Sequence, residues 1–230
     1  MNTIEKIVLA GILNVLFILP VLAQNRLSVD SSYLNSHYKS RVEFFRKMPD
    51  LKNEIVFLGN SLTEGGKWHE LIPKKHVINR GISGDVTYGI LARLDEILSS
   101  KPSKIFLLCG INDMKRGIPN AVIEANMERI LRQIKSHSPK TKLYVQGLLP
   151  VNESMLPASY SNLSNGKIDS LNKNLEMLSA KWGASYISLK AVFADDKGSL
   201  RKELSIDGLH LRQASYILWA NYLKKSGSLK

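Results

Sequence analysis

The stretch Ile55-Val56-Phe57-Leu58-Gly59-Asn60-Ser61-Leu62-Thr63 decides the fold. Its apolar, β-prone start predicts a buried strand, and the glycine predicts a sharp change of direction where that strand ends. A serine directly after such a turn is held rigidly and left exposed, which is the placement that a nucleophilic hydroxyl needs. Ser61 is therefore the candidate nucleophile.

Strands and helices alternate along the rest of the chain. With the first run, the β-prone segments are Ile55–Leu58, His76–Asn79, Lys104–Cys109, Lys142–Leu148 and Ser185–Leu189. Helical patterns cover Ser31–Met48, Val86–Ser99, Asn120–His137, Ile168–Trp182 and Gln213–Lys225. This order predicts βαβ units, and so an α/β fold: a three-layer αβα sandwich around a central, mostly parallel five-stranded sheet.

Short polar motifs follow the predicted strands. Gly84 comes after the second strand, Asn112 after the third, and Asp207-Gly208-Leu209-His210 lies in a loop before the last helix. Ligands of parallel sheets bind at the carboxyl ends of the strands, where these motifs are expected to meet. Ser61, His210 and Asp207 then supply a nucleophile, a base and an orienting carboxylate.

Taken in chain order, the four motifs resemble the SGNH hydrolases, also called GDSL esterases. The family's Ser, Gly, Asn and His blocks fall here on Ser61, Gly84, Asn112 and His210. The resemblance runs from the first strand to the last helix and implies a flavodoxin-like arrangement of the sheet. One residue departs from the family pattern, because Asn60 stands where an aspartate usually precedes the serine.

The resemblance implies a role for each motif. Ser61, His210 and Asp207 form the catalytic triad, and the oxyanion hole comprises the backbone N–H groups of Ser61 and Gly84 with the side-chain amide of Asn112. We expect Gly84 to open the following helix, so that its N–H lies at the positive end of the helix dipole.

Three other residues beside these motifs need assignments. Asp113 is assigned to structure beneath the site. Arg80 and Asp85 flank Gly84 and are expected to bind substrate; the alternative is that they contact each other.

Each motif alone has a simpler explanation. Ser61 would be a helix cap, Gly84 a turn glycine, Asn112 a loop cap and His210 a structural histidine. Their common order and their placement favour a site instead.

The first 23 residues predict a secretory signal peptide. An apolar run, Ile7–Ala23, follows Lys6 and ends in Val21-Leu22-Ala23, which is typical of a signal-peptidase site. The alternative is a membrane anchor, but the run is short and contains Pro20. We therefore expect one hydrolase domain at 24–230, exported to the periplasm or secreted, without stable membrane insertion after cleavage.

Composition limits the partners. The net charge of +12 suggests anionic partners. The sequence has no basic run interleaved with aromatic residues, so nucleic acid is not expected among them. The single cysteine, Cys109, ends an apolar run and is expected to be a core thiol. The five histidines show no metal-ligand spacing, so no metal and no cofactor are expected.

The family spans several ester substrates. The chain most resembles its compact subgroup of platelet-activating-factor acetylhydrolases and bacterial sialate or sugar O-acetylesterases. That resemblance, with export and positive charge, favours acetyl esters on carbohydrate. The polar loop Pro150–Gly166 is expected beside the site as a source of substrate contacts. The alternatives are a lysophospholipase, a thioesterase, or a non-catalytic glycan-binding module.

Overall fold

The computed structural model of the protein describes residues 31–73 and 75–229. The predicted signal peptide at 1–23 lies outside this range. Five strands form one sheet in the order β2-β1-β3-β4-β5, and each neighbouring pair is parallel. The strands are β1 (Ile55–Gly59), β2 (Val77–Gly81), β3 (Lys104–Leu108), β4 (Lys142–Gln146) and β5 (Ser185–Ile187). The predicted α/β class and five-stranded parallel sheet are confirmed.

The strand register brings the ends of three strands level. Gly59 at the end of β1 lies opposite Gly81 of β2 on one side and Leu108 of β3 on the other. The direction of chain progression also reverses at β1, because β2 lies on one side of it and β3 on the other. Such a switch point leaves a crevice at the carboxyl ends of the strands, where doubly wound proteins bind ligands.

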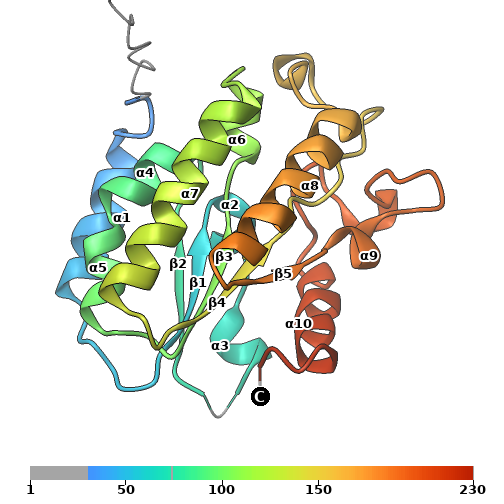
Figure 1. Ribbon diagram of the computed structural model, residues 1–230. Helices are drawn as coiled ribbons and strands as arrows, with labels where there is room; N and C mark the ends of the chain where they lie inside the picture. Colours follow the sequence, from blue (N-terminus) through green and yellow to red (C-terminus); the bar gives the residue numbers. More distant parts are fainter. Residues whose placement is uncertain (1–30, 74, 230) are drawn as a thin grey trace, which may run out of the picture.

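Helices cover both faces of the sheet (Figure 1). One layer contains α1 (Ser36–Lys47), α4 (Thr87–Ala92), α5 (Leu94–Ser99), α7 (Asn120–His137) and α8 (Asn165–Lys181). The other contains α3 (Trp68–Leu71), α9 (Lys190–Phe193) and α10 (Ser215–Lys225). Two single-turn helices, α2 (Ser61–Glu64) and α6 (Ile111–Lys115), start directly after β1 and β3, and two 3-10 turns are Ala158–Tyr160 and Lys202–Leu204.

Several element boundaries differ from the prediction. The helix predicted over Val86–Ser99 is wrong as one element, because Arg93 takes φ −122° and ψ 13° and separates α4 from α5. The first helix begins five residues later than the predicted Ser31, since the Asn35 side chain caps it by accepting from the Tyr38 N–H. Helix α8 begins earlier, at the Ser164 cap.

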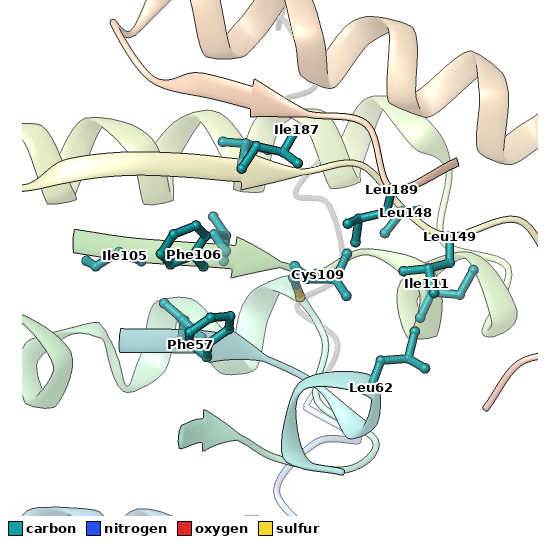
Figure 2. Close-up of a cluster of buried hydrophobic side chains, with 14 of the residues drawn as sticks. Phe57, Leu62, Ile105, Phe106, Cys109, Ile111, Leu148, Leu149, Ile187 and Leu189 are labelled. Atoms are coloured by element: carbon teal, nitrogen blue, oxygen red, sulfur yellow. The ribbon is translucent and has the colours of Figure 1, made fainter. Parts of the chain in front are cut away.

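The core extends from the middle of the sheet to the strand ends. Phe57 stacks on Trp68 at 4.0 Å between ring centroids and on Phe106 at 4.9 Å. Figure 2 shows this core continuing past the end of β3 to Cys109 and Ile111, with Leu62 of α2 beside it. Cys109 is a free, buried thiol, as predicted. The single-turn helices that follow β1 and β3 therefore pack against the hydrophobic core.

Residues 31–73 and 75–229 contain neither a helix suited to span a membrane nor a cluster suited to hold a metal ion. None of the helices described there is long and apolar enough to cross a membrane. In the same part of the chain, no group of three or more His, Cys, Asp or Glu side chains is placed to hold a metal ion.

The aromatic stack gives a stability prediction. Phe57→Ala should lower the free energy of unfolding by about 3–5 kcal/mol, because the cavity cannot close between flat rings. Urea denaturation measures this loss. Phe44→Ala is the matched control, since Phe44 is 51% exposed and its removal should change stability little. Similar shifts of the urea midpoint in both variants would contradict this account of the core.

Candidate active site

Ser61 is the first residue of α2, two positions beyond the end of β1. The turn is tight: a Cβ atom at Gly59 would lie 2.3 Å from Thr63 Oγ1 and 2.4 Å from the Leu108 carbonyl oxygen. Only glycine fits there. Asn60 is the N-cap of α2, and its Oδ1 accepts from the Leu62 N–H at 3.1 Å.

The amide nitrogen of Asn60 is buried and has no hydrogen-bond partner in the described part of the chain. The capping acceptor of the usual aspartate is thus kept, while its second oxygen is replaced by a donor.

Three side chains predicted to act together form a hydrogen-bonded series. Ser61 Oγ lies 3.2 Å from His210 Nε2, and His210 Nδ1 lies 2.7 Å from Asp207 Oδ2. Ser61, His210 and Asp207 are all partly exposed, so the series faces solvent. The structure therefore brings together residues that are 149 positions apart in the chain.

Hydrogen bonds within the loop hold Asp207 and His210 in place. The other oxygen of Asp207, Oδ1, accepts from the backbone N–H of Leu209 at 3.0 Å and of His210 at 2.7 Å. Gly208 between them has φ +89°, and a Cβ there would lie 2.6 Å from the Asn152 carbonyl oxygen.

Two opposing effects act on the Asp207 carboxylate. Burial raises its pKa, but the hydrogen bonds from His210 and Leu209 outweigh burial and hold the pKa below its ordinary value. Asp207 therefore stays ionised under mildly acidic conditions.

Gly84 lies in the loop after β2, not at the start of the next helix. Helix α4 begins at Thr87, and the N–H of Thr87 is occupied by both carboxylate oxygens of Asp113 at 3.1 Å. The predicted place of Gly84 at the start of the helix is therefore wrong, since the N-cap of α4 is Val86. What requires glycine at this position is its φ of +80°, which side chains rarely adopt.

The Gly84 loop is bonded to α2, the helix that carries Ser61. Glu64, on the same turn as Ser61, accepts from the Ser83 backbone N–H at 2.6 Å and from the Ser83 hydroxyl. His37 and Arg41 of α1 contact the same carboxylate at 3.1 and 3.2 Å. Burial raises the pKa of Glu64, but the hydrogen bonds from Ser83 and His37 outweigh it and lower the pKa below its usual value.

Asn112 reaches the loop from the opposite side. It is buried on α6, and its Nδ2 donates to the Asp85 carbonyl oxygen at 2.9 Å. An amide NH₂ has two hydrogens, so this bond leaves a second donor. The carbonyl oxygen of Gly84 itself accepts from Arg116 Nη2 at 3.0 Å. The loop is thereby held by both α2 and α6.

Arg80 and Asp85 do not form a substrate surface, and they do not pair with each other. Arg80 is 7% exposed and donates to Glu96 at 2.8 Å, while Asp85 is 1% exposed. Asp85 accepts from Arg93 at 3.0 Å. The expected substrate contacts are therefore wrong, because both side chains are directed into the protein and their charges are used there.

Arg93 helps to hold the site in place, and the sequence did not lead us to expect this role. Its buried guanidinium donates to the carbonyl oxygens of Gly59 at 3.1 Å and Arg80 at 2.9 Å, in addition to the Asp85 carboxylate. A signal was present, because Arg93 lies three residues after Ile90 and four before Ile97, on the apolar face of the predicted helix.

Comparisons with known proteins show which family the chain resembles in sequence. The sequence profile described as GDSL-like Lipase/Acylhydrolase family matches residues 57–217. Platelet-activating factor acetylhydrolase IB subunit alpha2 of Rattus norvegicus is 27% identical over 194 residues, covering 81% of this chain and 80% of that protein.

Solved structures share the fold. One from Streptococcus pneumonia is 29% identical, with a TM-score of 0.79, covering 86% of this chain and 95% of its own. A structure of an acetyl xylan esterase, AlAXEase, is 19% identical, with a TM-score of 0.63 and coverage of 75% and 98%, respectively.

Asp113 gives a pH-dependent prediction. It is assigned to structure, and its carboxylate accepts from the N–H and hydroxyl of Thr87 beneath the site. Burial raises the pKa of Asp113 from 3.8 to about 6. The folded state thus binds this proton more tightly than the unfolded chain, so the stabilisation is full below pH 3.8 and is lost as pH rises through about 6.

Asp113→Asn should remove this slope, which amounts to as much as ~3 kcal/mol between the two pKa values. The measurement is the free energy of unfolding in urea, for both proteins, between about pH 4 and about pH 7. Asp95→Asn is the control, since the Asp95 side chain is 71% exposed. Parallel curves for the parent and Asp113→Asn would refute the assignment.

Proposed function

The chain belongs to the GDSL-like lipase/acylhydrolase family, and we propose that it is an exported serine esterase that removes acetyl groups from O-acetylated carbohydrate. The observation that carries this proposal is the series from Ser61 through His210 to Asp207, with distances of 3.2 and 2.7 Å, at the carboxyl end of a parallel sheet. Family membership supports ester hydrolysis in general, and the site residues support a Ser-His-Asp route.

The hydrogen-bond partners assign the histidine tautomer. An ionised Asp207 only accepts hydrogen bonds, so His210 Nδ1 carries the proton that faces it. His210 Nε2 is then an acceptor for the Ser61 hydroxyl. In the first step Ser61 Oγ attacks the acyl carbon while His210 takes its proton, and His210 then gives that proton to the leaving alcohol. In the second step water attacks the acyl carbon while His210 takes its proton. His210 then returns that proton to Ser61 Oγ as acetate leaves.

The oxyanion that forms on the acyl oxygen needs donors fixed in advance. We assign this role to the backbone N–H groups of Ser61 and Gly84 and to the free hydrogen of the Asn112 amide. Supporting observations are the bond from Asn112 to the Asp85 carbonyl and the bonds that join Ser83 to Glu64. Both reduce the movement of donors that must stay in place as charge develops.

The packing of the apolar side chains of the loop Pro150–Gly166 favours a small acyl group. Leu163 is buried in the core, and Leu156 and Tyr160 pack against that core. These side chains therefore offer little surface for a lipid chain, which gains only ~0.8 kcal/mol per buried CH₂. The rat relative is named an acetylhydrolase, which also favours acetyl.

Export is proposed from the sequence of residues 7–23 alone, and a retained membrane anchor is the alternative. N-terminal sequencing of the mature protein distinguishes the two, because cleavage after Ala23 leaves Gln24 first.

Ser61→Ala should abolish esterase activity while leaving the fold intact. Without its nucleophile, turnover of p-nitrophenyl acetate should fall by ~10⁴-fold or more. The control is Ser170→Ala, which removes an exposed hydroxyl from α8 and should leave activity unchanged. Substantial activity of Ser61→Ala, with a normal urea midpoint, would exclude Ser61 as the nucleophile.

A chain-length series separates the acetylesterase from its relatives. The ratio kcat/KM should be highest for the acetyl ester and decline towards octanoyl p-nitrophenyl esters, and acetate should be released from acetylated glycans. A steady rise in kcat/KM with chain length would instead favour the lysophospholipase or thioesterase alternative. Each methylene in a good apolar groove would raise kcat/KM by about fourfold, given ~0.8 kcal/mol per buried CH₂.

A further inference from the structure

Lys115 is placed where it can reach a bound substrate. It is the last residue of α6 and lies three positions after Asn112, so the two side chains share one face of the helix. Its ammonium rests over the ring of Tyr160, 4.5 Å from the centroid. The Lys115 backbone oxygen also accepts from Asn162 Nδ2 at 3.0 Å, which fixes the Tyr160 loop against α6.

The same loop is also bonded to the loop that carries Asp207 and His210. Asn152 donates its backbone N–H to the carbonyl oxygen of Gly208 at 2.8 Å, and Gly208 separates Asp207 from His210. Lys115 and Asp207 are near enough to interact: burial and then Arg116 lower the pKa of Lys115, while Asp207 raises it. The ammonium thus lies at the rim of the site, between α6 and the Pro150–Gly166 loop.

Within residues 31–73 and 75–229, the Lys115 ammonium has no ion-pair partner and no hydrogen-bond acceptor. Asp207 directs Oδ2 to His210 Nδ1 and Oδ1 to backbone N–H groups. Lys115 therefore keeps three N–H donors on the side of the site where Asp207 lies. A partly buried ammonium with unused donors is suited to an anionic ligand group, because a charged acceptor gains most from such a site.

Resting on the esterase function proposed above, we propose that Lys115 binds a negatively charged group, a carboxylate or phosphate, on the alcohol portion of the ester. An acetyl group carries no charge, so the anion must belong to the alcohol. Arg116, the next residue, places a second cationic group, a guanidinium, on this side of the site through its bond to the Gly84 carbonyl. The net charge of +12 favours approach of such substrates.

The test compares matched substrate pairs. One pair is an O-acetylated uronic acid and its uncharged methyl ester; the other is acetylated glycerol phosphate and acetylated glycerol. Acetate release is measured for the parent protein, Lys115→Gln, and the control Lys173→Gln, which removes an exposed charge from α8. A lost hydrogen bond to a charged group corresponds to about a tenfold change in kcat/KM, expected mainly in KM.

The expected result is that the parent prefers the charged member of a pair and that Lys115→Gln loses this preference. Lys115→Gln should lose clearly less activity on the uncharged esters than on the charged ones, and Lys173→Gln should behave as the parent. Tyr160→Leu, which removes the ring under the ammonium, should give a smaller loss than Lys115→Gln, and Tyr160→Phe should give none. The pair with the larger effect identifies the anion as a glycan carboxylate or a phosphate.

Equal losses by Lys115→Gln on charged and uncharged esters would overturn the proposal, since Lys115 would then act through Asp207. No preference of the parent for the charged esters would also overturn it, while leaving the esterase function intact. Absence of acetate release from all four substrates, together with no turnover of p-nitrophenyl acetate, would instead refute the proposed function itself.

Discussion

The buried guanidinium of Arg93 is the interaction on which the rest of the site depends. It joins the carbonyl oxygen of Gly59, at the end of β1, to that of Arg80, near the end of β2, and it neutralises Asp85 in the loop beyond. A buried charge is stable only when its partners surround it, so removing one partner would leave an unpaired ion in the core. This requirement fixes the ends of both strands relative to each other, and with them Ser61 and the Gly84 loop.

The contacts around the Gly84 loop extend this constraint outward. Asn112 attaches α6 to the carbonyl oxygen of Asp85, and Glu64 attaches α2 to Ser83. Helix α1 joins the same network, since Arg41 donates to the Gly81 carbonyl oxygen and contacts Glu64. The proposed oxyanion donors therefore come from elements that are bonded to one another, as electrostatic preorganisation requires.

Much of the fold and the site was predictable from sequence, because the relevant signals are local. Apolar runs of strand length alternate with helical patterns, and a parallel sheet places the motifs that follow its strands on one edge. The loop before α10 brings Asp207 and His210 to Ser61 there. Side-chain direction was not predictable in the same way. Proximity to Gly84 along the chain suggested a substrate role for Arg80 and Asp85, but strand and loop geometry direct both inward to ion pairs.

The break in the helix at Arg93 shows a second limit of prediction from the sequence. Helical periodicity continues through it, whereas the backbone leaves the helix at Arg93, whose guanidinium is bonded to Gly59, Arg80 and Asp85. The single-turn helices α2 and α6 also depend on tertiary contacts, because helices of four or five residues are not stable without the core beneath them.

The most direct test of the central claim, that Ser61 is activated by His210 and Asp207, is labelling with a fluorophosphonate followed by mass spectrometry of peptides. The account predicts a single adduct on the peptide that contains Ser61, loss of esterase activity in step with labelling, and much slower labelling in His210→Ala. Failure to modify Ser61 in a folded protein would contradict the account and favour a non-catalytic glycan-binding module.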